Sequence, residues 1–171
     1  MNIDFDALYR DTYPRVFGLC LRLLGRRPQA EDATQEVFVR AYRALASYDP
    51  SQPFEPWVLG IAGNHCVDLI RRRHREQGLF AEEAADGTDP DDAPAALDLL
   101  IEAEQGEALR RAVDSLPDKF RVPLVLAYYN DWGYERIAAE LGITRNHVGV
   151  LLLRARRRLR EALHGVEEAI R

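Results

Sequence analysis

The stretch YERIAAELGITRNHVGVLLLRARRRLR, residues 134–160, indicates two helices joined by a tight turn. Its apolar and small residues recur at the spacing that two packed helices need: Ile137, Ala138, Leu141, Ile143, Val148 and Leu151. Gly142 stands where the first helix must end, because glycine adopts the left-handed conformation of a helix C-terminus without a Cβ penalty. Thr144 is then placed to cap the second helix by accepting a backbone N–H hydrogen bond. The pattern therefore predicts a helix-turn-helix.

The second helix of this pair leads into a basic tail with five arginines between residues 154 and 160. In a DNA-binding helix-turn-helix the second helix enters the major groove, and nearby arginines contact phosphates. An ordinary corner between two helices of a bundle has a similar apolar pattern. The basic tail favours the DNA-binding interpretation.

The formal net charge of −5 does not argue against nucleic-acid binding, because the charge is unevenly distributed. Residues 79–106 contain nine acidic residues and no lysine or arginine, whereas residues 1–78 carry a net charge of +1 and residues 107–171 one of +3. Gly, Pro, Ala and acidic residues dominate residues 78–97, so we expect a flexible acidic linker there. We hypothesise that this linker folds back and masks the basic tail in the free protein.

Helical periodicity runs through most of the remaining sequence, and no stretch alternates as a strand would. We therefore expect an all-α protein with two small helical domains, residues 1–77 and 98–171, joined by the linker. The predicted helices span residues 4–24, 28–46, 56–76, 97–115, 117–129, 134–141 and 144–163. Two prolines lie inside these spans: Pro14 is expected to kink or split the first helix, and Pro123 to bend or delay the fifth.

The sequence contains no pattern typical of a catalytic or metal site. Cys20 and Cys66 are expected to be buried, reduced thiols, and Cys66 points about 100° away from its neighbour His65 on a helix, which disfavours joint metal binding. There is no phosphate-binding glycine loop, no histidine pair on a helix face and no nucleophile elbow, so we expect no enzyme, no cofactor and no metal. No apolar run approaches the ~18 residues of a membrane span, and no signal peptide is apparent, so we expect a cytoplasmic protein without membrane insertion.

Three segments, in this order, resemble one known family. They are AEDATQEVFVRAYRAL (30–45), PWVLGIAGNHCVDLIRRRHR (56–75), and the helix-turn-helix with LPDKFRVPLVLAYYNDWG (116–133) before it. The combination is similar to bacterial RNA polymerase sigma factors of the extracytoplasmic-function (ECF) class of the sigma-70 family. The resemblance covers roughly residues 3–77 and 98–163. It implies a region 2 domain, which binds core polymerase and reads the −10 promoter element, and a region 4 domain, which reads the −35 element.

The resemblance also implies the partners. Core RNA polymerase would be bound through the clamp coiled coil of its largest subunit and the flap of its second largest subunit, and the free protein would be a monomer controlled by an anti-sigma factor. The residues that match the family's clamp-binding surface are Asp32, Gln35, Glu36 and Arg40. From the residues alone, a solvated polar helix face is the favoured interpretation. A charge-rich interface fits an association whose rate and specificity are tuned electrostatically.

For the −10 element, the resemblance implies capture of a flipped base of the non-template strand. The residues implied are Ser51, Gln52, Phe54, Asn64, His65, Asp68, Arg71 and Arg72. Asn64 carries both a donor and an acceptor for the edge of an unstacked base, and Asp68 lies one turn further on the same face. Trp57 is expected to belong to the core rather than to a stacking platform. Arginines at the end of this helix are expected to follow phosphates.

For the −35 element, the implied residues lie along the second helix of the helix-turn-helix: Arg145, Asn146, His147, Val150, Arg154 and Arg157. Arginine to guanine and asparagine to adenine are the pairings that geometry favours. The sequence departs from the family at Gly149, Val150 and Leu151, where many relatives have polar and basic residues. Val150 is left to contact a thymine methyl group or the backbone, which puts the promoter sequence in doubt.

The interpretation that best fits these residues is a dissociable promoter-specificity subunit. An alternative is a dimeric helix-turn-helix repressor or activator that acts without polymerase, and it leaves the segment around Asn64 unexplained. A helical adaptor without DNA contact is a further alternative, and it leaves the arginine clusters unexplained.

Overall fold

The computed structural model describes residues 3–75, 78–80 and 106–170, with the side chains of residues 166–170 excepted. Over these residues all regular secondary structure is helical, as predicted. The chain divides into two compact units. Unit 1 comprises Met1–Glu76 and Tyr129–Asp131, and unit 2 comprises Gln77–Tyr128 and Trp132–Arg171. Most of the predicted linker and the first part of the predicted helix 97–115 lie outside the described residues.

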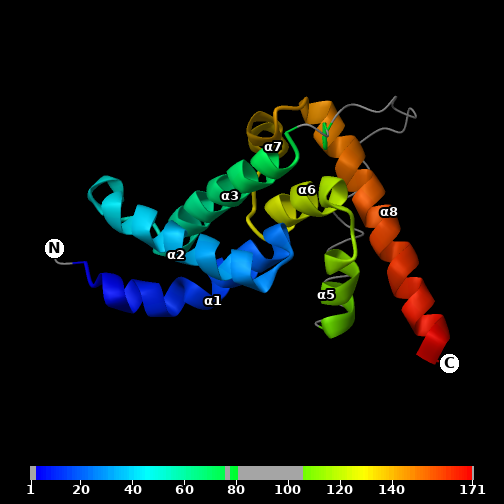
Figure 1. Ribbon diagram of the computed structural model, residues 1–171, viewed down its shortest axis with the longest axis horizontal. Helices are drawn as coiled ribbons and strands as arrows, with labels where there is room; N and C mark the ends of the chain where they lie inside the picture. Colours follow the sequence, from blue (N-terminus) through cyan, green and yellow to red (C-terminus); the bar gives the residue numbers. More distant parts are fainter. Residues whose placement is uncertain (1–2, 76–77, 81–105, 171) are drawn as a thin grey trace. The chain divides into compact units, whose positions relative to one another are not determined.

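Unit 1 is built from three helices that pack against one another (Figure 1). They are α1 (Phe5–Leu24), α2 (Arg27–Arg43) and α3 (Phe54–Arg73), with a short 3-10 helix, η1 (Leu45–Ser47), after α2. The side chain of Asp4 caps α1 by accepting a hydrogen bond from the backbone N–H of Ala7 at 3.1 Å. Gly25 ends α1 with a φ of 77°, at the predicted boundary of this helix, and a proline occupies the first turn of α2.

The helices of unit 1 differ from the prediction at several points: α2 and α3 each end three residues earlier than predicted, and two further differences involve prolines. First, α1 is not split at Pro14 but runs unbroken from Phe5 to Leu24. Proline removes one backbone hydrogen bond, and since Pro14 is exposed the loss occurs on the solvent side. Second, α3 begins at Phe54 rather than near Pro56. Pro56 therefore lies in the first turn, where the backbone N–H has no helical partner in any case.

Apolar side chains from all three helices fill the interior of unit 1. Each of the following is fully buried: Val16, Leu19 and Leu23 of α1, Val37 of α2, and Val58, Val67 and Ile70 of α3. Complete burial of such a side chain contributes about 1.5–3 kcal/mol. This core fixes the faces that α2 and α3 turn outward.

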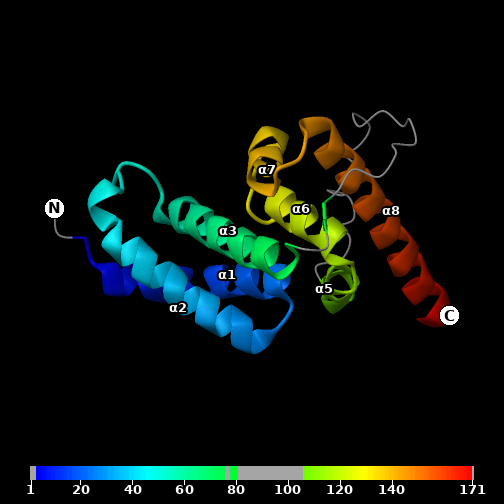
Figure 2. The same cartoon turned by 45° about the horizontal axis from the view of Figure 1, so that its top comes forward.

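Unit 2 contains α5 (Glu107–Asp114), α6 (Asp118–Tyr128), α7 (Tyr134–Leu141) and α8 (Arg145–Ile170), as Figure 2 shows. Helices α7 and α8 form the predicted helix-turn-helix and pack against each other. Gly142 ends α7 with a φ of 68°, and the hydroxyl oxygen of Thr144 accepts a hydrogen bond from the backbone N–H of His147 at 3.1 Å. Both local predictions are confirmed, and α8 extends past its predicted end at residue 163.

The core of unit 2 draws on α6, α7 and α8. Leu126, Ile137, Leu152 and Leu159 are almost completely buried, at 0–1% exposure. Pro123 lies inside α6 and is itself buried. Phe80, which falls in the range predicted as linker, is also buried. The average composition of residues 78–97, on which the linker prediction was based, gave no sign that this side chain is buried.

Candidate functional site

A groove of about 410 Å³ lies between α2 and α3 in unit 1. Its apolar lining comes from Leu24, Ala33 and Leu69, and its polar lining from Gln29, Asp32, Glu36, His65 and Arg73. Two of the predicted clamp-binding residues, Asp32 and Glu36, therefore border a concave surface. The other two, Gln35 and Arg40, are exposed on α2.

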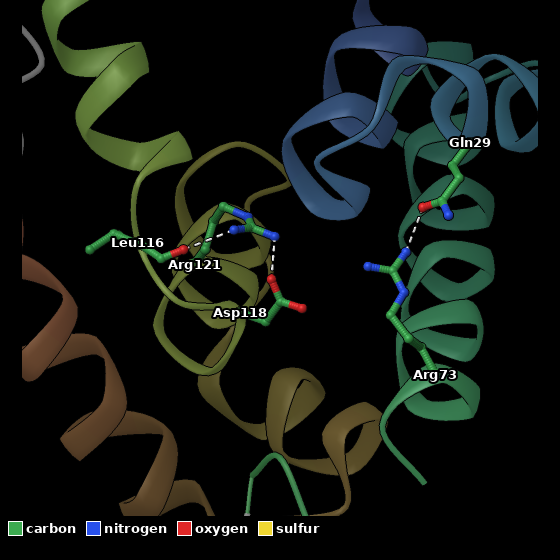
Figure 3. Close-up of polar contacts among 5 residues, drawn as sticks. All are labelled: Gln29, Arg73, Leu116, Asp118 and Arg121. Carbon is green, nitrogen blue, oxygen red and sulfur yellow. Dashed lines mark hydrogen bonds and ion pairs between the residues drawn. The ribbon is translucent and has the colours of Figure 1, made fainter. Parts of the chain in front are cut away.

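Charges along α2 are paired within the helix. Arg40 donates to Glu36 at 2.7 Å, and this hydrogen bond is the main reason why the pKa of Glu36 lies below its ordinary value. Both side chains are nearly half exposed, so the pair contributes little to stability and remains accessible to a partner. At the end of the groove, Arg73 of α3 donates to Gln29 of α2 at 2.6 Å (Figure 3). The groove thus has a polar bridge between its two helices.

His65 lines this groove together with Glu36. Partial burial lowers the pKa of His65, and the nearby charge of Arg40 lowers it further, against the opposing effect of Glu36. The groove therefore favours the neutral form of this imidazole. The sequence analysis placed His65 among the residues implied for the −10 element. In the structure it lies instead beside the predicted clamp-binding residues.

The loop before α3 is held in shape by its own side chains. The carboxylate of Asp49 accepts hydrogen bonds from the backbone N–H and the hydroxyl of Ser51 at 2.9 and 2.8 Å, which lowers the pKa of Asp49. The hydroxyl of Tyr48 donates to the carbonyl of Gln52 at 2.5 Å. Ser51 and Gln52 are exposed, as a contact with DNA requires.

Phe54 does not share this exposure. Its side chain is 6% exposed, and its ring contacts those of Phe5, Tyr48 and Trp57 at centroid distances of 6.2, 5.4 and 5.4 Å. Phe54 thus supports the loop from beneath and is not presented to a base. Trp57 lies in the same ring cluster but is only half-buried, so it lies at the edge of the core rather than inside it as predicted.

The remaining −10 candidates lie on the outer side of α3. Asn64, Asp68, Arg71 and Arg72 are all exposed. Residues four apart on a helix share a face, so Asn64 and Asp68 lie one above the other, with the two arginines a further turn along. The structure therefore brings an amide, a carboxylate and two guanidinium groups onto one surface.

In unit 2 the first turn of α8 presents Arg145 and Asn146 to solvent. The guanidinium of Arg145 is engaged by α7: its Nε donates to Glu135 at 2.7 Å, and it lies 5.6 Å from the centre of the Tyr134 ring. A backbone hydrogen bond at Glu135 and, next, the one from Arg145 lower the pKa of Glu135. Arg157 is exposed further along α8, and Arg154 is half-buried.

His147 and Val150 were predicted to reach DNA, but they are only 8% and 7% exposed. The whole segment from His147 to Leu152 is buried. The structure therefore leaves these two side chains out of the surface formed by Arg145 and Asn146. Nε2 of His147 has no hydrogen-bond partner among the described residues.

Two buried arginines of unit 2 were missed by the sequence analysis. Arg121, 7% exposed, donates to the carboxylate of Asp118 at 2.5 Å and to the carbonyl of Leu116 at 2.8 Å (Figure 3). Arg156, 2% exposed, donates from Nη1 to the hydroxyl of Tyr128 at 2.8 Å. The sequence does contain a sign that Arg156 is buried, because this residue lies on the same face of α8 as Leu152, Leu159 and Leu163.

Among the described residues, no group of three or more histidine, cysteine, aspartate or glutamate side chains is placed to hold a metal ion. No helix in the described ranges is long and apolar enough to cross a membrane.

These features define a class of protein in which a helical bundle with a charged groove is joined to a helix-turn-helix unit. Residues 8–76 match the family Sigma-70 region 2, and residues 106–159 match the family Sigma-70, region 4. The chain belongs to the ECF RNA polymerase sigma factors. The resemblance inferred from the sequence is therefore confirmed.

Among its relatives is the ECF RNA polymerase sigma factor SigE of Mycolicibacterium smegmatis, which is 36% identical over 97% of this chain. The chain spans 65% of the length of that relative. The ECF RNA polymerase sigma factor SigW of Bacillus subtilis is 33% identical over 94% of this chain and 87% of its own length. Because these relatives are sigma factors, the alternative of a dimeric repressor is not favoured.

The fold resembles that of the sigma factor RpoE of Bartonella quintana, solved in complex with the anti-sigma factor NepR. The TM-score is 0.58, with 22% sequence identity, and the match covers 94% of this chain and 97% of that one. At this level of identity the likeness concerns the fold alone.

Proposed function

We propose that this chain binds core RNA polymerase through the α2–α3 groove, captures bases of the −10 element on α3, and docks on −35 duplex through α8. The observation that carries the proposal is the position of these surfaces on matched regions: the groove and the face of Asn64 lie within residues 8–76, and Arg145 lies within residues 106–159. In this proposal residues 1–77 form the region 2 domain, 78–97 the linker and 98–171 the region 4 domain.

The groove suits the clamp coiled coil of the largest polymerase subunit. Asp32, Gln35, Glu36 and Arg40 supply exposed charges and an amide, and the apolar lining supplies area that a helix can bury. Charges at the rim of an interface act mainly on the association rate and on the choice of partner. The flap of the second largest subunit is proposed as the partner of unit 2.

Promoter opening in this proposal requires no chemical reaction. A surface that binds unstacked bases, but not the same bases in the duplex, shifts the equilibrium toward open DNA by its differential affinity. Asn64 would hydrogen-bond the edge of a flipped base, and Ser51 and Gln52 would line its entry from the loop. Arg71 and Arg72 would neutralise phosphates. The protein acts as a specificity subunit without enzymatic activity, cofactor or metal.

At the −35 element, the proposal assigns base contacts to Arg145 and Asn146 and phosphate contacts to Arg154 and Arg157. Arg145 must exchange Glu135 for its DNA partner, so part of the binding energy replaces an existing ion pair. The free protein is proposed to be a cytoplasmic monomer held inactive by an anti-sigma factor.

Titration of the labelled full-length chain with sigma-free core polymerase tests this proposal. Saturable binding of one chain per core enzyme is expected, with size-exclusion chromatography placing the free chain at the size of a monomer. A dimer that binds duplex DNA tightly and core polymerase not at all would refute it.

A further inference from the structure

The interior of unit 1 contains a polar cluster that the proposed function does not use. Cys20 of α1, Thr34 of α2 and Cys66 of α3 are each 0% exposed. The thiol of Cys66 donates to the sulfur of Cys20, with the two sulfur atoms 3.6 Å apart. The hydroxyl of Thr34 donates to the carbonyl of Ala30 at 2.7 Å, which fixes its position beside the thiols. Three helices thus meet around two sulfur atoms in contact.

The distance between the sulfur atoms is short enough to matter chemically. A disulfide requires about 2.05 Å between sulfurs, so the pair has about 1.5 Å to close. Both thiols are free, and they come from α1 and α3, which pack directly on each other. Forming the bond requires rotation of the two side chains and a shift of α1 against α3.

The two thiols are not equivalent. The hydrogen bond from Cys66 lowers the pKa of Cys20, with a smaller contribution from Thr34, and these outweigh the effect of burial. The same hydrogen bond and burial raise the pKa of Cys66 well above its ordinary value. Because the thiolate is the nucleophile and Cys66 donates its hydrogen bond to the sulfur of Cys20, the geometry favours Cys20 as the sulfur that reacts first and Cys66 as the one that resolves.

We propose that Cys20 and Cys66 form a redox modification site, a dithiol that hydrogen peroxide converts into a disulfide between α1 and α3. In the first step the thiolate of Cys20 attacks one oxygen of the peroxide, the O–O bond breaks, and the departing hydroxide takes up a proton to leave as water. In the second step the sulfur of Cys66 attacks the sulfenic acid of Cys20, the S–O bond breaks, and a second water leaves with the thiol proton. The two sulfurs together lose two electrons, and the peroxide gains them.

The burial of both thiols restricts which oxidants can reach them. Buried cysteines are inert while the fold stays closed, so the reaction requires local opening of the three-helix unit. Hydrogen peroxide is neutral and close to water in size, so a smaller opening admits it than a bulky reagent needs. The product joins two positions separated by 46 residues in the sequence, which restricts the unfolded chain and stabilises unit 1. Cys66 follows His65 directly and lies two residues after Asn64, so any movement of α3 reaches both the groove and the −10 surface.

Mass spectrometry of the full chain tests the site without polymerase, so its outcome does not depend on the proposed function. The chain is treated with hydrogen peroxide, quenched with catalase, denatured and alkylated with a maleimide. The expected product has lost two hydrogen atoms, carries no alkyl group, and yields one linked peptide pair from α1 and α3. Dithiothreitol should restore both alkylatable thiols, and a higher thermal midpoint should accompany oxidation.

Single variants test the order of the two steps. Cys66→Ser should accumulate a sulfenic acid on Cys20 that dimedone traps, whereas Cys20→Ser should trap little or none. Two thiols that remain fully alkylatable after peroxide treatment of the wild type would overturn the proposal, as would a disulfide between two chains. Equal trapping in both variants would overturn the assignment of Cys20 as the first to react.

Discussion

The two units of this sigma factor differ in what they bury. Among the described residues, the buried polar side chains of unit 1 are the hydroxyls of Thr12 and Thr34, whereas those of unit 2 are Arg121, Arg156 and His147. A hydroxyl satisfied by a backbone carbonyl has a small desolvation cost, whereas a buried guanidinium depends on its partners. The fold of unit 2 should therefore be far more sensitive to the loss of one charge than the fold of unit 1.

The proposed DNA-binding surfaces of the two units also differ in how exposed their side chains are. Asn64, Asp68, Arg71 and Arg72 are exposed on α3, whereas on α8 the segment from His147 to Leu152 is buried and Arg145 is paired with Glu135. The surface proposed for −10 capture is presented by a helix packed on an apolar core. The surface proposed for −35 docking must release an ion pair first.

The largest expected effect is on the buried ion pair of unit 2. Asp118→Asn removes the carboxylate charge that the guanidinium of Arg121, which is 7% exposed, contacts, and we expect it to destabilise unit 2 by about 3 kcal/mol. Urea denaturation followed by circular dichroism measures this. The control is Glu107→Gln, which breaks an exposed ion pair with Arg111 and should change stability by less than about 0.5 kcal/mol. Equal losses of stability in the two variants would mean that the buried and the exposed ion pair contribute alike to the fold.

The next effect in size concerns the −10 surface. Asn64→Ala removes both the donor and the acceptor proposed for base recognition, and the holoenzyme should bind single-stranded −10 DNA about 10- to 100-fold more weakly. Fluorescence anisotropy with a labelled oligonucleotide measures the affinity. Asn146→Ala is the matched control in unit 2: it should leave −10 binding intact and weaken −35 duplex binding. If both variants weaken both ligands alike, the division of labour between the units is wrong.

The α2–α3 groove should show a moderate effect. Glu36→Gln removes one rim charge and should weaken binding to core polymerase by about three- to tenfold, mainly through a slower association rate. Stopped-flow measurements at two salt concentrations separate the rates. Glu107→Gln, which breaks a pair of the same i, i+4 spacing on α5, should leave both rates unchanged. An unaltered association rate in the Glu36 variant would remove the groove from the interface.

Release of Arg145 should have a smaller and opposite effect. Glu135→Gln frees the guanidinium from an exposed ion pair, so the affinity for −35 duplex should rise about two- to fivefold. Electrophoretic mobility shifts at fixed ionic strength measure it, with Glu107→Gln as a control for net charge. A loss of affinity would instead indicate that Glu135 orients Arg145 for DNA.

The smallest effect is a pH dependence of unit 1. The pKa of His65 in the folded protein lies below the ordinary value of 6.5, so the unfolded chain takes up this proton first as the pH falls. The contribution of His65 to stability is therefore present above pH 6.5 and declines as the pH falls below 6.5 toward the folded pKa. Thermal melts across this range should show a slightly flatter profile for His65→Gln than for the wild type. A steeper profile would contradict the direction of the shift.

Local sequence signals predicted the helix-turn-helix almost to the residue. Gly142 and Thr144 carry their structural information within one turn, so the end of α7 and the cap of α8 follow from the residues themselves. The ordered set of segments likewise identified the family without coordinates. These are the parts of the molecule in which neighbouring residues decide the conformation.

Burial was harder to predict, because it depends on packing between distant segments. Phe54 and Val150 were predicted to be contact residues, yet both are buried, and Arg156, which was counted in the basic tail, is buried as well. The placement of His65 in the groove also required the packing of α2 against α3. Helical periodicity shows which side of a helix faces the core. It does not show how much of the helix surface the neighbouring segments bury.

The most direct test of the central claim is transcription from a randomised promoter library by core polymerase reconstituted with this chain. We expect transcripts that share one −35 and one −10 element, with Asn64→Ala abolishing the preference at the −10 element alone. Transcription that requires the chain but shares no promoter element, or no transcription despite saturable core binding, would contradict the account.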